Sequence, residues 1–227
     1  MNRARRFAVL FIGAAVAAGT PSVIAPISLA QAGETAKVDA SAKVTEIFAL
    51  LSKSPGLFAR FSEQRKIALL VSPLKSEGTV HFDRKKGLAR HTTAPKKQSL
   101  LLAGSELTFW DGVKTEHVRL DGSPALRAFA EGFSMLLSAD RAGLEKSFEF
   151  ELVGNPKEDW TLTLAPKSAE LKNIVKAIVV KGRGEVFTSV DVQEKNGDNT
   201  LTTFSNVDVR HAYSEEEALK TFRVPPI

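Results

Sequence analysis

Most of the chain after residue 55 alternates between apolar and polar residues with a period of two, which is the pattern of half-buried β-strands. The alternating stretches are short, and Gly104, Asp111-Gly112 and Asn196-Gly197-Asp198 separate neighbouring ones. Such residues favour tight hairpin turns. The sequence therefore predicts an antiparallel meander of short strands. The predicted strands cover residues 57–73, 77–83, 87–95, 98–104, 105–112, 115–122, 148–154, 159–166, 174–182, 185–198 and 199–209.

Residues 123–147 interrupt this alternation with apolar residues at helical spacing. Ser123-Pro124 suits the start of one helix, and Ala139-Asp140 suits the cap of a second. The apolar residues exceed the single stripe of a surface helix. They are Leu126, Phe129, Phe133, Met135, Leu136, Leu137 and Leu144. We interpret this segment as a movable cover over a hydrophobic hollow, although an ordinary hydrophobic core explains the same residues equally well.

Two further helices are predicted outside the meander. The first begins at Ser41, after a frayed terminus at 33–40, and ends at Ser54-Pro55-Gly56. The second is a short capped helix at residues 214–222. The apolar face of the first helix consists of Val44, Ile47, Phe48 and Leu51.

The first 32 residues have the organisation of a secretory signal peptide. Three arginines precede an apolar run at 7–19, and Ala30-Gln31-Ala32 matches the small-x-small pattern of signal peptidase sites. A membrane anchor would need about 20 apolar residues. We therefore predict that residues 1–32 are removed, and that residues 33–227 form a single exported domain.

Charge and cysteine content narrow the classes of function. The leader holds three arginines and no acidic residue, so its removal lowers the net charge from +5 to +2. A charge this small does not indicate a nucleic-acid partner, and the short run Arg84-Lys85-Lys86 is typical of a solvated hairpin. Because the chain has no cysteine, an exported fold must rely on a sizeable hydrophobic core instead of disulfides.

No constellation in the sequence indicates catalysis. Nucleophile elbows, phosphate-binding loops and dinucleotide-binding glycine patterns are missing from it. The acidic residues lie mainly at turns and helix caps, where they bond to the local backbone. The histidines do not have the spacing of metal ligands; they are His81, His91, His117 and His211. We expect no enzyme activity, no metal and no cofactor.

Several segments share their order and spacing with one protein family. They are FARFSEQRK (58–66), SEGTVHFDRKKGLARHTTAP (76–95), GSELTFWDG (104–112), LLSADRAGLEKSFEF (136–150), DWTLTLAPK (159–167), DVQEKNGDNTLTTFSNV (191–207) and FRVPP (222–226). Together they resemble the LolA-type periplasmic lipoprotein carriers over residues 44–226. The resemblance implies a mainly β fold with short helices. It consists of an incomplete antiparallel β-barrel around a hydrophobic cavity, covered by an N-terminal helix and a central helical lid.

The resemblance also implies a function in the periplasm. Such a carrier shields the acyl chains of lipoproteins, takes them from an inner-membrane transporter and passes them to an outer-membrane receptor. We expect it to act as a monomer. The form of residues 136–150 resembles a diverged branch found with exporters of other lipids, which leaves a non-lipoprotein lipid open as the cargo. A lipid-sensing regulatory protein and an enzyme for lipid-linked substrates are the remaining alternatives.

Two kinds of site residue follow from these interpretations. Arg90 stands where the family has an arginine, which the resemblance implies holds the closed lid; the alternative is a surface arginine of a strand. The neighbouring His91 stands where the family usually has tryptophan. The residues predicted to line the cavity and the lid are Phe61, Phe82, Leu101, Trp110, Phe129, Phe133, Met135, Leu136 and Leu137.

Overall fold

The computed structural model describes residues 33–122 and 124–224. The predicted signal peptide therefore lies outside the described residues. The side chains of a few helical residues, among them Phe129 and Phe133, are also outside what the structure describes.

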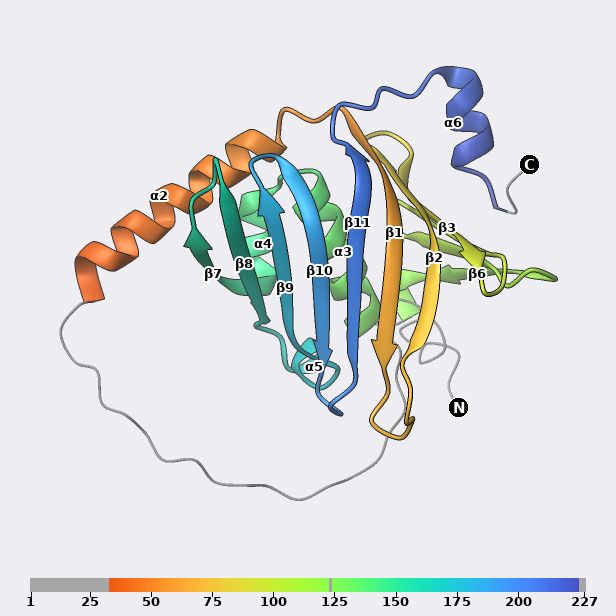
Figure 1. The fold of residues 1–227 in the computed structure, drawn as a ribbon, viewed down its shortest axis with the longest axis horizontal. Helices are drawn as coiled ribbons and strands as arrows, with labels where there is room; N and C mark the ends of the chain where they lie inside the picture. The colour runs from red at the N-terminus through yellow and green to blue at the C-terminus, as the bar shows by residue number, and fades with distance from the viewer. Residues whose placement is uncertain (1–32, 123, 225–227) are drawn as a thin grey trace.

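A single antiparallel sheet of eleven strands forms the body of the molecule (Figure 1). The strands are β1 (Gly56–Lys66), β2 (Leu74–Asp83), β3 (Gly87–Ala94), β4 (Gln98–Ala103), β5 (Glu106–Trp110), β6 (Thr115–Arg119), β7 (Phe148–Gly154), β8 (Asp159–Pro166), β9 (Val175–Arg183), β10 (Val186–Glu194) and β11 (Asn199–Asp208). Their order is β6-β5-β4-β3-β2-β1-β11-β10-β9-β8-β7. The sheet is not closed into a barrel, which confirms the predicted fold class.

The connection between β6 and β7 explains why helices interrupt the meander. These strands are consecutive in the chain but form the two opposite edges of the sheet. The intervening segment therefore crosses the sheet, and it does so as η1 (Leu120–Gly122), α3 (Pro124–Leu137) and α4 (Arg141–Ser147). Figure 1 shows α3 and α4 behind the sheet, on one of its two faces. We call this covered face the inner face.

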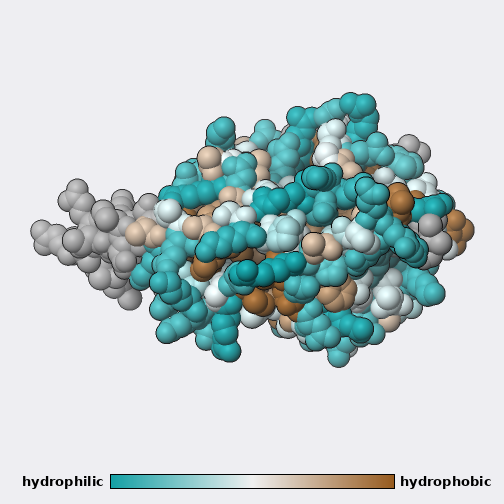
Figure 2. All heavy atoms as spheres, turned by 90° about the horizontal axis from the view of Figure 1, so that it is seen from above, coloured by the Kyte–Doolittle hydropathy of each residue, from teal (hydrophilic) through white to brown (hydrophobic). Residues whose placement is uncertain are grey.

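The remaining helices lie near the ends of the sheet. They are α2 (Gly33–Leu51), α5 (Ala169–Lys172) and α6 (Glu215–Thr221). In Figure 1, α2 runs obliquely past the upper ends of β7 to β10, and α6 lies at the upper right. Figure 2, a view from above, shows a mainly hydrophilic surface with a group of hydrophobic atoms exposed between the hydrophilic ones.

Two predicted boundaries were wrong. The first helix begins at Gly33 and not at Ser41, because residues 34–40 contain good helix formers such as Ala36 and Lys37 that extend it towards the N-terminus. The first strand ends at Lys66, and residues 67–73 form turns instead of continuing the strand. The predicted helical segment 123–147 corresponds to α3 and α4.

Candidate functional site

The inner face of the sheet is apolar over one half of its area. Leu57 pairs with Phe82, which in turn pairs with Leu88 on the next strand. Residues two positions apart share a face of a strand, so the pairing continues this apolar surface from strand to strand. We call the resulting surface the apolar half. It consists of Leu57, Ala59, Phe61, Val80, Phe82, Leu88, Leu102 and Leu107.

The helix α3 packs against the apolar half and fills most of the space above it, and α4 packs against α3 and β7. Leu136 and Leu144 are 2% and 0% exposed, and Met135 and Leu137 pack at the margin of the core. Two of the spaces beneath these helices measure only about 30 and 10 Å³. A space of about 170 Å³ lies at the edge of α3, between Leu102 and its neighbours on the helix. The structure therefore has its helical cover closed.

Close approach of α3 to the sheet depends on Gly132. A Cβ atom at this position would lie 2.6 Å from the ring of Phe148, which is itself 1% exposed. What the structure shows is a packing role, because a side chain at residue 132 would push α3 away from Phe148.

The structure describes the side chains of seven of the nine residues predicted to line the cavity and the lid. Phe61 and Phe82 lie on the inner face and are each 3% exposed. Met135, Leu136 and Leu137 lie on α3 and pack against or within the core. The side chains of Phe129 and Phe133 are outside the described part of the chain.

Leu101 and Trp110 were predicted to share a face with Phe61, and this was wrong. The register pairs Leu100 with both Arg90 and Phe109 on the inner face, so Leu101 and Trp110 point to the opposite face. The local sequence does not reveal which side chains of β4 point to the inner face. Residues 100–102 are three consecutive leucines, so an apolar side chain points inwards with either alternation.

An arginine outside the predicted site, Arg84, joins the end of α3 to the rest of the fold. Its Nε donates to the carbonyl of Ser54 at 2.9 Å, and its Nη2 donates to the carbonyl of Ser52 at 3.0 Å. Its Nη1 donates to the carbonyl of Ser138 at 2.9 Å, just beyond α3. Carbonyls at helix C-termini lack intrahelical partners, and a guanidinium offers five donors. Arg84 thus ties the ends of α2 and α3 to the turn between β2 and β3.

Arg90 has different partners. Its Nη2 lies 2.9 Å from Oε1 of Glu63, and its guanidinium lies 4.2 Å above the ring of Phe61. Within residues 33–122 and 124–224, the side-chain partners of Arg90 therefore lie on β1 and not on α3 or α4. A latch role for Arg90 stays a prediction. The sequence missed Arg84 because its partners come from the ends of two remote helices.

The other half of the inner face is polar and open. It surrounds a cavity of about 580 Å³, which we call the polar chamber. Glu63 at its wall accepts hydrogen bonds from Ser76 and Thr202 in addition to its contact with Arg90. Burial raises the pKa of Glu63, but Arg90 and these hydroxyl groups outweigh it and hold the pKa below its ordinary value. The chamber wall contains Glu63, Arg65, Pro73, Leu74, Lys75, Ser76, Arg90, Thr92, Pro95, Lys96, Gln98, Ser99, Leu100, Phe109 and Thr200.

The C-terminal segment from Tyr213 to Thr221 packs against the face of the sheet opposite the inner face, which we call the outer face. His91 Nε2 bonds to the carbonyl of Thr221 at 2.8 Å, and His81 Nδ1 lies 3.1 Å from the hydroxyl of Tyr213. That hydroxyl donates to the carbonyl of Leu57. Burial, then the neighbouring histidines, lowers the pKa of His81 to about 4. His91 thus anchors this segment on the outer face.

The described residues contain no cluster of three or more histidine, cysteine or acidic side chains placed to hold a metal ion. Over the same residues, no helix combines the length and the hydropathy that crossing a membrane requires. The inner face, with its apolar half and its polar chamber, is therefore the candidate site, and its surfaces suit binding.

Comparisons with known proteins bear on the nature of this site. Residues 32–223 match the family described as "Outer membrane lipoprotein carrier protein LolA-like". An outer-membrane lipoprotein carrier protein of Pseudomonas entomophila (strain L48) is 27% identical over 175 residues, which cover 74% of this chain and 79% of that protein. Its counterpart in Pseudomonas putida (strain GB-1) is 26% identical over 188 residues, with coverages of 80% and 84%. A crystal structure of a LolA superfamily protein from Nitrosomonas europaea covers 78% of this chain and 96% of its own, at 10% identity and a TM-score of 0.45.

Proposed function

This chain belongs to the LolA-like family of outer membrane lipoprotein carriers, and we propose that it is a periplasmic carrier. In this proposal, it binds the acyl chains of a lipoprotein on the apolar half of its inner face. It takes its cargo from an inner-membrane transporter and passes it to an outer-membrane receptor. The predicted signal peptide supports export to this compartment, and the relatives named as carriers support the class of cargo.

One observation carries the proposal: an apolar sheet face is covered by a segment that the sheet does not need for its own hydrogen bonding. The eleven strands pair without α3 and α4, which cross from one edge of the sheet to the other. Displacement of these helices would expose a wide apolar surface while leaving the sheet intact. A ligand pocket for apolar chains needs such a concave and mostly apolar wall.

The closed cover also provides a means of release. Each CH₂ group removed from water contributes about 0.8 kcal/mol, so a lipid leaves readily only if something else occupies its place. Leu136 and Leu137 on α3 line the residual space above the sheet, where an acyl chain would lie. We propose that the cover and the cargo compete for the apolar half, with Arg84 stabilising the closed cover.

Binding of an acylated peptide tests the proposal directly. An environment-sensitive dye should bind to lipid-free protein, and the acylated peptide should displace it, whereas the same peptide without its acyl chains should not. Amide exchange across residues 124–147 should change when the acylated peptide binds, because the cover has to move. Absence of binding to lipid-free protein would contradict the carrier function.

A further inference from the structure

The polar chamber lies on the same face as the apolar half and continues it. On β1, Leu57, Ala59 and Phe61 belong to the apolar half, and Glu63 and Arg65 follow at the same two-residue spacing. Arg90 lies at the junction, since its guanidinium lies above the ring of Phe61. The inner face is therefore amphiphilic along the direction of its strands, with an apolar end and a charged end.

Cationic side chains predominate in the wall of the chamber. The wall contains Arg65, Arg90 and Lys96 with a single acidic residue, Glu63. Lys75 also borders the cavity, but it pairs with Gln64, so its side chain points to the face opposite Glu63. The Glu63 carboxylate is already bound by Arg90 and two hydroxyl groups. The chamber wall therefore carries an excess of positive charge that its own carboxylate does not neutralise.

The cations of the wall differ in their partners. Within the described part of the chain, Lys96 forms no ion pair, although Asp111 lies near it. Arg65 has Asp198 at 3.8 Å, and Glu194 also lies near it. The Nε atoms of Arg65 and Arg90 are buried and have no hydrogen-bond partner among the described residues. Both guanidinium groups belong to the wall of the cavity, and guanidinium groups match the geometry of carboxylates and phosphates.

We propose that the polar chamber binds an oxyanion that the cargo carries next to its acyl chains. This inference rests on the proposed carrier function and adds the chemical class of the cargo, an anionic amphiphile. The volume of about 580 Å³ is within the range of small-molecule sites. The acyl chains occupy the apolar half, and a carboxylate or phosphate bonds to Arg65, Arg90 and Lys96. The oxyanion is either a phosphate of a lipid head group or an acidic side chain beside the acylated residue of a peptide.

Two pairs of matched probes test this inference and distinguish the two sources. Oleoylglycerol and oleoylglycerol phosphate differ only in the phosphate. An acylated peptide with aspartate beside its lipidated residue and the same peptide with asparagine differ only in the carboxylate. We expect at least one anionic probe to bind about tenfold or more tightly than its neutral partner, with the preference falling as salt is added. The pair that shows the preference identifies the source of the oxyanion.

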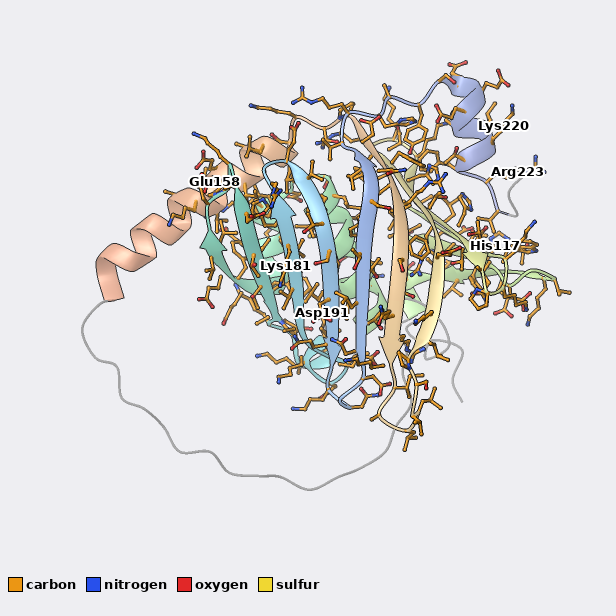
Figure 3. All side chains as sticks on the ribbon, viewed as in Figure 1. His117, Glu158, Lys181, Asp191, Lys220 and Arg223 are labelled. Carbon is orange, nitrogen blue, oxygen red and sulfur yellow. The ribbon has the colours of Figure 1, made fainter. Side chains whose placement is uncertain are left out.

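Charge-neutral variants locate the effect in the chamber. In K96Q, the exposed lysine of the wall loses its charge, and the core is not disturbed. This variant should lose much of the preference for the anionic probe and keep its affinity for the neutral one. The matched control is K181Q on β9, which removes the same charge from an exposed position outside the chamber. Figure 3 shows Lys181 on the side of the sheet opposite the helices. The control should keep the preference.

Equal affinities within both probe pairs would overturn the inference and leave the carrier function standing. So would a preference that K96Q retains in full. Binding of none of the four probes would instead contradict the carrier function and, with it, this inference. The failure of each proposal is therefore distinguishable in a single set of measurements.

Discussion

The two halves of the inner face are built from the same strands but differ in what covers them. Above the apolar half, α3 leaves spaces of about 10, 30 and 170 Å³ between itself and its neighbours. The polar half retains a cavity of about 580 Å³. The reason is chemical. Apolar side chains on a helix gain free energy by covering Leu57 or Phe82, whereas covering Arg65 or Arg90 would remove charges from water at a cost.

Because of this difference, the two halves of the inner face differ in whether a ligand can reach them before α3 moves. The apolar half has to be covered when it is empty, so its binding capacity depends on movement of α3. The polar chamber is open in the structure with α3 closed, so it is accessible without movement of α3. An amphiphile would then meet the chamber first and the apolar half only after α3 moves.

The largest expected effect tests which leucines of β4 and β5 point to the inner face and which point to the outer face. Leu107 is 0% exposed on the inner face, so Leu107→Ala should lower the free energy of unfolding by about 2–5 kcal/mol. Leu101→Ala, on the partly exposed outer face, should cost about 1 kcal/mol. Urea denaturation of both variants measures the difference. A larger loss in Leu101→Ala would show that the faces are exchanged.

The next effect concerns the cover. Arg84→Gln should weaken the three hydrogen bonds to backbone carbonyls, and charge-assisted bonds of this kind contribute about 1.5–3 kcal/mol. Amide exchange in residues 124–137 should then rise about tenfold. Lys85→Gln on the same exposed turn is the matched control and should leave exchange unchanged.

The variant Arg90→Gln, measured beside these two, tests whether Arg84 or Arg90 stabilises the closed cover. Because Arg90 contacts Glu63 and Phe61, we expect exchange in residues 124–137 to stay near the wild-type rate. Faster exchange in Arg90→Gln together with normal exchange in Arg84→Gln would make Arg90 the latch and Arg84 an ordinary turn residue.

A smaller effect is expected at Glu63 in the polar half. Glu63→Gln leaves Arg90 without its carboxylate and should cost about 1–2 kcal/mol at neutral pH. The folded-state pKa of Glu63 is below the ordinary value of 4.5, so its stabilisation is present above that pH and is lost as the pH falls. Urea denaturation should therefore show the two proteins converging in acid. A constant difference at all pH values would exclude the ionised carboxylate as the cause.

The last prediction has the opposite dependence on pH. Burial, only partly offset by Arg65, raises the pKa of Glu194 to about 8. A raised folded-state pKa gives stability that is present in acid and lost as the pH rises towards about 8. Glu194→Gln should therefore become progressively more stable than the wild type as the pH rises from about 5 to about 8. Parallel stability curves for the two proteins would contradict the raised pKa.

Much of the fold follows from local sequence. Period-two alternation and turn residues such as Gly104 and Asn196-Gly197-Asp198 predicted the strands, because hairpin turns and half-buried strands depend on neighbouring residues. Helical spacing predicted the segment 123–147 for the same reason. The burial of Phe61, Phe82 and Leu136 also follows from periodicity.

Tertiary structure alone decided what these elements do together. The pairing of β1 with β11 joins the two ends of the chain and completes a sheet whose edges are β6 and β7, so the predicted helical segment has to cross it. The face of Leu101 depended on register with β3, since alternation permits two parities and only pairing selects one. Arg84 bonds to carbonyls just beyond the ends of α2 and α3. These helix ends come close to Arg84 only in the folded chain, so the residues next to Arg84 in the sequence do not predict the contact. The polar chamber likewise exists because Arg65, Arg90 and Lys96, distant in sequence, reach one cavity only when their strands and turns assemble.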